Sequence, residues 1–266
     1  MELRSVELAV PDPGEAGQFF EKTWGLLPAG EGRFRGAGSH PWIIEVQKGE
    51  PAIRSIDFSC SSKELQKLNE KGLLKKNCVQ GPEGQVYRFI ADEKPLAEIK
   101  DADKPIRITH VVLNTPDREA CERFAVDVLG FTVSDRTKHM TFVRCNSKHH
   151  CLAFAGSDAP SLNHIAFEVP SLEAVMRGIG RMRDAGFEAV WGPGRHGPGN
   201  NVFGYFIAPW GGIVEYTAEV SQVGPDYRVG GPDDWTWPPG RIDHWGVSKK
   251  DTAKTGPAEK LFRFTS

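Results

Sequence analysis

The sequence contains no paired cysteines and no long apolar segment. Its five cysteines among 266 residues are scattered, and no two of them have the Cys-x-x-Cys spacing. This pattern argues against a disulfide framework and a structural zinc site, and it favours free thiols in a reducing compartment. No apolar stretch approaches the ~20 residues that a membrane-spanning helix needs. The first five residues lack an apolar signal core, so we expect a cytoplasmic protein without a membrane partner.

An excess of positive charge is also missing. The chain has 33 Lys and Arg residues against 35 Asp and Glu residues, which gives a formal net charge of -2. Because no basic surface is available to attract a polyanion, nucleic acid is not an expected partner. The hydrophobic fraction of 39% and the charged fraction of 26% are typical of a globular protein, and the length suits one or two domains.

An internal repeat organises most of the chain. Residues 5–10 alternate like a strand, and a Pro-Asp pair then leads into a helical stretch at residues 15–26. Residues 110–114 have the same character, and a second Pro-Asp pair leads into a helical stretch at residues 119–129. A proline near the start and a glycine at the exit favour a helix in each place. Two copies of one structural plan are therefore predicted.

Further segments of the two halves also correspond to each other. The aligned pairs are residues 53–58 with 162–167, 84–91 with 201–208, and 97–100 with 214–217. Short alternating segments separated by glycine and proline are typical of half-buried strands. Each half is thus predicted to use a βαβββ pattern twice, which gives an α+β fold of tandem modules.

These patterns divide the chain into three parts. Residues 1–103 are predicted to form an amino-terminal module without a metal site, and residues 104–219 a carboxy-terminal catalytic module. Residues 220–266 are predicted to form an irregular arm rich in proline and tryptophan. Because three exposed tryptophans would be unfavourable in water, we expect this arm to pack over the body of the protein. They are Trp235, Trp237 and Trp245.

The two halves differ in chemistry at equivalent positions. These positions hold His110, His164 and Glu215 in the second half, and Ser5, Ser55 and Glu98 in the first. Two neutral imidazoles and one carboxylate can occupy one face of an octahedral divalent ion and leave the other face open. This arrangement suits non-haem Fe(II) and O2 chemistry. Because side chains alternate along strands, three such ligands can share one concave face. We therefore predict one metal site, in the second half, with Glu98 as a relic.

Around these residues the sequence resembles the type I extradiol ring-cleavage dioxygenases of the vicinal oxygen chelate superfamily, which also includes glyoxalases and bleomycin-resistance proteins. The resemblance is to dioxygenases of 2,3-dihydroxybiphenyl, trihydroxytoluene and methylcatechol. It extends over about residues 1–220 and is strongest from Ile108 onward. The matching segments are residues 109–113, 146–154, 162–169, 194–196 and 205–216. The resemblance implies two barrels of tandem modules, of which the second holds the metal.

An activity and a set of partners follow from this resemblance. It implies extradiol, or meta, ring cleavage of a catecholic aromatic diol with O2, in the catabolism of aromatic compounds. Fe(II) is the implied cofactor, and Mn(II) is accepted by the same ligand set. A small aromatic diol and O2 are the implied partners, and the chain is expected to form a homo-oligomer as its relatives do.

The resemblance also implies roles for residues outside the ligand set. His150 matches a family histidine beside the O2 site, Tyr205 a tyrosine that hydrogen-bonds the diol, and His196 a histidine near the substrate hydroxyl. His149 and His150 are predicted to alternate along a strand, so that only His150 faces the pocket. Because Cys151 follows these histidines, a reactive thiol is an alternative interpretation of this segment.

The chain departs from the family pattern at residues 197–201, which read Gly-Pro-Gly-Asn-Asn. This loop is expected to shape the substrate pocket, so the substrate of the biphenyl-diol members does not transfer to this chain. The sequence resembles more the branch that acts on small monocyclic substrates, such as methyl-substituted catechols or trihydroxytoluenes. Two other functions stay open. One is a glyoxalase-like, metal-dependent lyase or isomerase, which uses one ligand more; Ser5 and Ser55 argue against it. The other is a metal-free, ligand-sequestering protein of the same fold, which the three intact ligands argue against.

Overall fold

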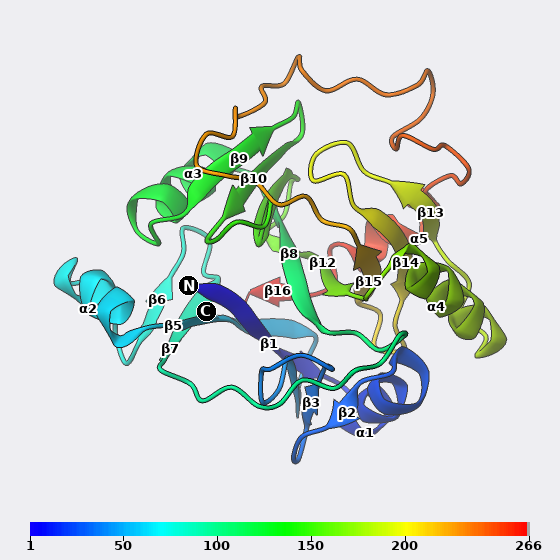
Figure 1. Ribbon diagram of the computed structural model, residues 1–266, viewed down its shortest axis with the longest axis horizontal. Helices are drawn as coiled ribbons and strands as arrows, with labels where there is room; N and C mark the ends of the chain where they lie inside the picture. Colours follow the sequence, from blue (N-terminus) through cyan, green and yellow to red (C-terminus); the bar gives the residue numbers. More distant parts are fainter. Residues whose placement is uncertain (265–266) are drawn as a thin grey trace.

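Two mixed β-sheets, one from each half of the chain, form the body of the protein (Figure 1). The structure is a computed structural model and describes residues 1–264. The first sheet has the strand order β2-β3-β4-β1-β5-β7-β6, with β16 paired to β5. Its strands are β1 (Glu2–Val10), β2 (Leu27–Pro28), β3 (Arg33–Arg35), β4 (Ile44–Lys48), β5 (Ala52–Cys60), β6 (Cys78–Gln80), β7 (Val86–Ala91) and β16 (Arg263–Phe264).

The second sheet has the strand order β13-β14-β15-β12-β8-β11-β10-β9. Its strands are β8 (Arg107–Thr115), β9 (Thr132–Arg136), β10 (Met140–Arg144), β11 (Leu152–Gly156), β12 (Ser161–Glu168), β13 (Trp191–Arg195), β14 (Val202–Ile207) and β15 (Ile213–Ala218). Each sheet has an antiparallel pair at its centre, β1 with β5 in the first sheet and β8 with β12 in the second. Each of these strands is the first strand of one repeated unit. The predicted α+β fold of tandem modules is confirmed.

Helices lie outside the sheets and begin at side-chain caps. They are α1 (Pro13–Gln18), continued by the π-helical turn η1 (Phe19–Trp24), α2 (Ser62–Glu70), α3 (Arg118–Asp127), α4 (Leu172–Asp184) and α5 (Thr252–Ala258). The aspartates of the two Pro-Asp pairs, Asp12 and Asp117, accept hydrogen bonds from backbone N–H groups of the first helical turn. Each such cap stabilises its helix by about 1 kcal/mol, so the aspartate explains why both helices begin where the sequence predicts.

An aromatic contact joins the two halves directly behind β15. The ring of Trp24, at the end of η1, stacks on Tyr216 with a centroid distance of 3.6 Å and an interplanar angle of 5°. The Tyr216 hydroxyl donates a hydrogen bond to the Trp24 carbonyl oxygen at 2.7 Å. Because neighbouring residues of a strand point to opposite faces, this contact fixes β15 from one side and leaves Glu215 on the other.

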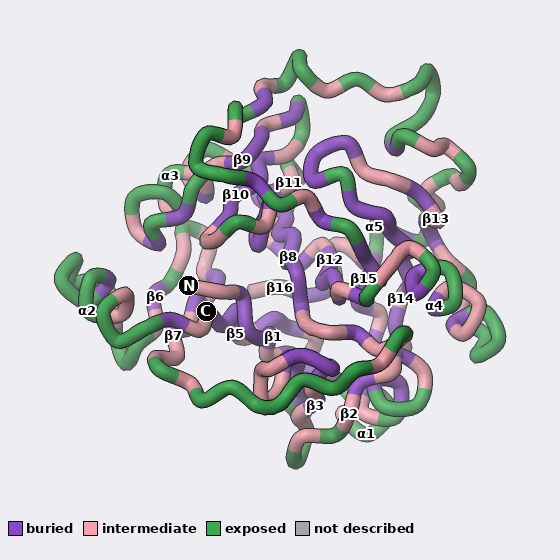
Figure 2. Tube along the Cα trace, in the orientation of Figure 1, coloured by how far each residue is buried: buried purple, intermediate pink, exposed green. Residues whose placement is uncertain are grey.

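The strand predicted at residues 97–100 is wrong. This segment has no regular structure, and Leu96 and Ile99 are 41% and 40% exposed. It belongs to an exposed stretch that runs along one side of the first sheet (Figure 2). The place beside β5 is taken by β7 instead, which pairs with β5 in parallel. The first half therefore has one strand fewer at this edge than the second.

The arm after residue 219 also differs from the irregular segment that we expected. It lacks regular structure up to residue 251, but α5 follows, and β16 then joins the edge of β5 in the first sheet. The arm therefore leaves the second half, passes around it and returns to the first half (Figure 1).

The cysteines are free thiols, as predicted. Burial raises the pKa of the Cys151 thiol well above its ordinary value, and a thiol with a raised pKa is a poor nucleophile at neutral pH. This argues against the reactive-thiol interpretation. Within residues 1–264, none of the helices combines the length and the apolar character required to span a bilayer.

Candidate metal centre

Three adjacent strands at the centre of the second sheet bring His110, His164 and Glu215 together. His110 lies on β8, His164 on β12 and Glu215 on β15, and β12 is the middle strand of the three. Ala166 of β12 pairs with His110 on one side and with Glu215 on the other. Because His164 precedes Ala166 by two residues, its side chain emerges on the same face. The strand registers therefore create this cluster from residues far apart in sequence.

The ligand atoms of the cluster converge on one point. The Nε2 atoms of His110 and His164 each lie 3.2 Å from Oε2 of Glu215. Each residue offers one ligand atom, and these three atoms all lie within 4.8 Å of one another. All three side chains are buried. The trio selected from the sequence is thus one compact cluster.

Hydrogen bonds around His164 test whether this cluster fits a cation. Asn163 Nδ2 donates to Asn114 Oδ1 at 2.9 Å, which directs Asn163 Oδ1 to His164 Nδ1 at 2.7 Å. Since Oδ1 is only an acceptor, His164 Nδ1 carries the proton and Nε2 carries a lone pair. That lone pair faces a carboxylate oxygen of Glu215, and within residues 1–264 Nε2 has no hydrogen-bond partner.

Two acceptors that face each other in a buried site repel unless a cation lies between them. A proton or a divalent metal ion can fill this role, and two imidazoles with one carboxylate are a ligand set for such ions. Burial raises the pKa of Glu215, but the nearby His110 and His164 lower it more, so the net pKa is below its usual range. The carboxylate is therefore charged, and the residues fit a divalent metal.

Asn201 also positions Glu215, and the sequence interpretation missed this role. Its side chain is fully buried, with Nδ2 at 2.8 Å from Thr217 Oγ1 and at 3.4 Å from Glu215 Oε1. From the sequence, Asn201 was expected only as part of a loop that shapes the substrate pocket. Counting back by twos from Tyr205 along β14 leads to Asn201, so strand alternation could have indicated that it faces the cluster.

Tyr205 and His196 lie together beside the cluster. Tyr205 of β14 pairs with Glu215, and its ring centroid is 4.9 Å from that of His164. Its hydroxyl is 2.9 Å from Nε2 of His196, which itself lies 4.0 Å from Glu215 Oε1. Burial lowers the pKa of His196 to about 3 and raises that of Tyr205 well above its ordinary value. Both groups are therefore neutral.

His150 lies on another side of the cluster, with its ring centroid 4.2 Å from that of His110. Burial, together with His110, lowers the pKa of His150 well below its ordinary value. The predicted strand alternation of His149 and His150 is wrong, because both lie in the loop before β11 and both are buried. His150 faces His110, whereas His149 points to Asp135.

The loop at residues 197–201 packs tightly against His150. It is closed by a hydrogen bond from the His196 N–H to the Asn201 carbonyl oxygen at 3.0 Å. Gly199 has a φ of 79°, and a Cβ atom there would lie 3.0 Å from Cε1 of His150. A side chain at Gly199 would therefore displace His150, which explains the glycine at this point.

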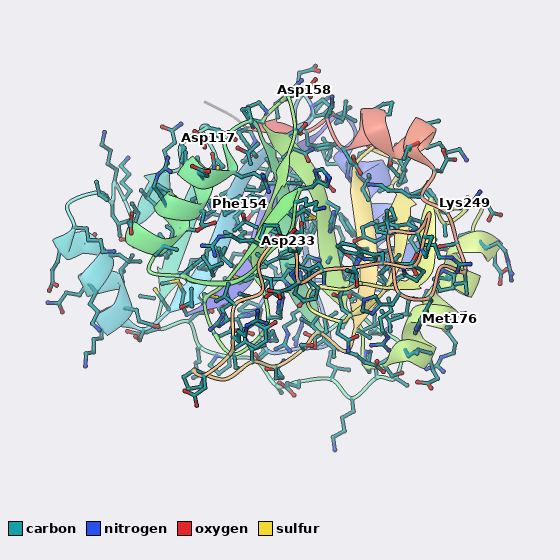
Figure 3. The ribbon with its side chains drawn as sticks, turned by 90° about the horizontal axis from the view of Figure 1, so that it is seen from above. Asp117, Phe154, Asp158, Met176, Asp233 and Lys249 are labelled. Carbon is teal, nitrogen blue, oxygen red and sulfur yellow. The ribbon has the colours of Figure 1, made fainter. Side chains whose placement is uncertain are left out.

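The arm covers this loop and the adjoining edge of the sheet. A Cβ atom at Gly197 would lie 3.5 Å from atoms of three arm residues, Trp235, Trp237 and His244. The His244 N–H donates to the Arg195 carbonyl oxygen at 2.8 Å. In Figure 3 the arm runs in front of the strands between the labelled Asp233 and Lys249. Arm tryptophans thus pack over the body of the protein as predicted.

An ion pair occupies the corresponding place in the first half. Ser5 pairs with Asp57 as His110 pairs with Ala166, and Asp57 pairs with Arg88 as Ala166 pairs with Glu215. Arg88 is therefore the equivalent of Glu215 in strand register. The prediction that Glu98 is the relic of Glu215 is wrong, because Glu98 lies in the exposed segment after β7.

The side chains at this place form a closed network around Asp57. Arg88 donates through Nε and Nη2 to the two carboxylate oxygens, at 2.9 and 2.7 Å. The hydroxyls of Ser5 and Ser55 donate to the same two oxygens, at 2.8 and 2.7 Å. The carboxylate is thus fully satisfied by protein groups, and no cation is needed.

Comparisons with known proteins agree with this architecture. The model of the Glyoxalase/Bleomycin resistance protein/Dioxygenase superfamily matches residues 107–216. Metapyrocatechase 2 of Cupriavidus necator is 35% identical over 139 residues, 51% of this chain and 41% of that protein. An iron-dependent extradiol dioxygenase of Rhodococcus jostii is 32% identical over 130 residues, 43% of each chain. The chain thus spans about two fifths of the length of these relatives.

A solved structure matches nearly the whole chain. The Mn(II)-bound glyoxalase from Novosphingobium aromaticivorans is 30% identical, with a TM-score of 0.84, over 95% of this chain and 93% of that one. The predicted vicinal oxygen chelate fold is confirmed by this match and by the family match.

Proposed function

The chain belongs to the glyoxalase/bleomycin resistance protein/dioxygenase superfamily, and we propose that within it the protein is an extradiol dioxygenase, which cleaves the ring of a catecholic aromatic diol with O2. The observation that carries this proposal is the convergence of His110, His164 and Glu215. Three protein ligands leave room for both oxygens of a diol and for O2 on the same ion. The similarity to the metapyrocatechase and to the Rhodococcus extradiol dioxygenase supports the same activity.

Fe(II) is the proposed cofactor, with Mn(II) as the alternative. The name of the Rhodococcus relative specifies iron, whereas the Novosphingobium relative contains Mn(II), and the ligand set accepts either ion. When bound, the ion would supply a Lewis acid for the diol and an electronic link between diol and O2. The side chains of the protein would then bind and orient the diol and transfer protons.

Tyr205 and His196 are proposed to bind the diol. Their polar atoms form one hydrogen-bonded pair next to Glu215. Nε2 of His196 faces the Tyr205 hydroxyl at 2.9 Å, so it can accept a hydrogen bond from that hydroxyl or from a diol. This pair therefore supplies a hydrogen-bond acceptor and a donor in one place, which orients a substrate hydroxyl.

His150 is proposed to act on the O2 side. It lies beside His110, and it is neutral and buried. A neutral imidazole can hydrogen-bond to negative charge that develops on oxygen without placing a fixed positive charge in the site. We propose that His150, after it has taken up a substrate proton on Nε2, donates a hydrogen bond to that charge and transfers the proton to it.

The substrate is proposed to be a small monocyclic diol, in the catabolism of aromatic compounds. This proposal follows the sequence resemblance to dioxygenases of methylcatechol and trihydroxytoluene. The loop at residues 197–201, which lies between His150 and the arm, is proposed to shape the substrate pocket. The cytoplasmic location and the homo-oligomer expected from the sequence stay predictions. Light scattering during size-exclusion chromatography tests the second of them.

The full-length match to a glyoxalase favours a second candidate, a metal-dependent lyase or isomerase. One experiment separates the two. The protein is reconstituted with Fe(II) under anaerobic conditions, and catechols are added with a measured amount of O2. We expect one O2 consumed per catechol and a yellow ring-opened product. Turnover of an α-keto hemithioacetal substrate without O2 consumption would instead support the lyase, and purified protein without any metal affinity would overturn both.

A further inference from the structure

A chain of buried polar groups extends from His150 away from the metal centre. His150 Nδ1 lies 3.0 Å from Nδ1 of His149, and His149 Nε2 lies 2.5 Å from Oδ2 of Asp135. His149 is 1% exposed and Asp135 is 0% exposed. The metal ligands are not part of this chain, and the proposed roles above do not use His149 or Asp135.

The contacts of Asp135 define which atom carries each proton. The Tyr227 hydroxyl donates to Oδ2 of Asp135 at 2.9 Å, and the Gly230 N–H donates to Oδ1 at 2.7 Å. A carboxylate accepts only, so His149 must donate its Nε2 proton to Asp135. Burial and the Asp135 carboxylate raise the pKa of Tyr227 to about 12, so its hydroxyl keeps its proton and remains a donor.

The protons of the two histidines are consequently coupled. When His149 is neutral and carries its proton on Nε2, its Nδ1 has a lone pair and accepts a hydrogen bond. The only group of His150 that faces this lone pair is Nδ1, which must then carry the His150 proton. Nε2 of His150 is left with a lone pair, on the side away from His149.

We propose that Asp135 and His149 are positioning residues that fix the tautomer of His150, so that its Nε2 is a proton acceptor in the resting site. The tautomer follows from the hydrogen bonds alone, whereas its role in proton transfer from substrate rests on the proposed function. When Nε2 of His150 gains a proton from bound substrate, its Nδ1 proton moves to Nδ1 of His149. The Nε2 proton of His149 then moves to Oδ2 of Asp135. One proton enters, one proton ends on the carboxylate, and both imidazoles remain neutral.

The arm completes the outer end of this chain. Tyr227 and Gly230 both lie on it, and Gly230 pairs with Asp135 in an isolated parallel bridge. The Gly230 carbonyl oxygen also accepts from the Arg136 N–H at 2.9 Å. Asp135 is therefore held from both sides by the arm. This gives the arm a function beyond cover, because it orients the carboxylate that orients His149.

The side chain of His149 is not needed to hold its own loop. The His149 N–H donates to the Ser221 carbonyl oxygen at 2.9 Å, and the Ser134 hydroxyl donates to the His149 carbonyl oxygen. Because the backbone is anchored on both sides, a change in the hydrogen bonding of the imidazole can leave the loop in place. Substitutions at Asp135 therefore report on proton positions.

Asp135→Asn is the decisive variant. Gly230 N–H requires an acceptor at the Oδ1 position, so the amide NH2 of the asparagine takes the Oδ2 position and donates to His149 Nε2. His149 must then carry its proton on Nδ1 and donate it to His150 Nδ1, which moves the His150 proton to Nε2. The expected result is a reversed His150 tautomer. Asp158→Asn is the matched control, because Asp158 is an exposed aspartate paired with Lys260.

The tautomer is measured by long-range 1H–15N NMR spectra of histidine-labelled protein without added metal. The wild type and Asp158→Asn should show the Nδ1–H tautomer of His150, and Asp135→Asn the Nε2–H tautomer. An Nε2–H tautomer in the wild type overturns the proposal even if the variant does not fold. An unchanged tautomer in a folded Asp135→Asn protein overturns it as well.

Kinetics then test the consequence. With catechol and Fe(II), Asp135→Asn should lower kcat by about 100-fold, the scale of one lost acid–base contribution, with KM changed less than threefold. Asp158→Asn should leave both unchanged. If the wild type cleaves no catechol while the tautomers behave as expected, the proposed function fails and the positioning role stands. If kcat is unchanged in Asp135→Asn, the positioning role has no part in turnover and the relay is wrong.

Discussion

The two halves of the molecule place opposite charges at equivalent points of their two sheets. In the first half Arg88 occupies the register position and pairs with the buried Asp57. In the second half Glu215 occupies it, and Ala166 replaces the aspartate. Both places contain one buried carboxylate, and a buried carboxylate requires a cation partner. The first half supplies that partner as a side chain, whereas the second supplies two imidazoles, which fit the proposed metal ion as the cation.

The occupancy of the carboxylate oxygens by protein donors explains why only the second half is a candidate for catalysis. The Asp57 carboxylate has all of its acceptor positions used by Arg88, Ser5 and Ser55. Around Glu215 a lone pair of His164 still faces the carboxylate. The closed network leaves no acceptor free, whereas the open one offers the ligand atoms that the proposed metal ion requires.

Removal of one imidazole should have the largest effect. His164→Ala deletes a proposed ligand, so bound iron should fall from about one per chain to a small fraction, with loss of ring cleavage. We expect more than 100-fold weaker binding, because even groups that only orient a ligand are worth 10–100-fold. Iron content after anaerobic reconstitution and desalting measures this.

The register equivalent of His164 in the first half provides the control. Ser55→Ala removes one hydrogen bond to Asp57 and should reduce stability by about 1 kcal/mol, while iron content stays at the wild-type level. Full iron and full turnover in His164→Ala would show that this histidine is not a ligand.

Breaking the ion pair of the first half should destabilise the fold without touching the metal. Arg88→Met leaves Asp57 buried and uncompensated, which costs about 3 kcal/mol, the lower end of the range for buried pairs because Arg88 is 32% exposed. Urea unfolding should show this loss.

The double variant Arg88→Met with Asp57→Ala removes both charges and copies the alanine of the second half. We expect it to recover more than half of the lost stability, since no unpaired carboxylate remains. Equal stability of the single and double variants would mean that the ion pair is not the source of the effect.

The sequence predicts the second half better than the first. His110, His164 and Glu215 could be selected because each lies on a strong alternating segment, and because their chemistry differs from that of Ser5 and Ser55. The four strand-and-helix units could be found for the same reason. Similarity alone aligned residues 84–91 with β14, however, since both segments are aromatic and alternating.

The alignment of the two halves by sequence similarity contained no information about strand order. A missing strand in the first half shifts β7 into the place of β15, and no local pattern reports such a shift. The contacts of Asp135 could not be predicted either, because His149 and Tyr227 come from segments that only the tertiary fold brings together. The buried Asn201 is an intermediate case, since alternation from Tyr205 pointed to it.

A smaller effect is expected at Asn201, which orients the Glu215 carboxylate through a hydrogen bond of 3.4 Å. Asn201→Ala should weaken metal binding by about 10-fold, the lower limit for residues that orient a ligand, because this hydrogen bond is long. Competition with a chelator of known affinity measures the change. The neighbouring Asn200 is exposed, so Asn200→Ala should leave the affinity within twofold of the wild type. Equal affinities for the two variants would remove Asn201 from the metal centre.

The smallest effect concerns Glu98, and it tests which residue of the first half corresponds to Glu215. Sequence similarity selects Glu98, whereas strand register selects Arg88. Because Glu98 lies in an exposed segment without regular structure, Glu98→Gln should change the free energy of unfolding by less than about 0.5 kcal/mol, as is usual for surface substitutions. Iron content should not change. A loss of stability as large as that of Arg88→Met would mean that Glu98 belongs to the core network after all, and the register comparison between the halves would have to be redrawn around it.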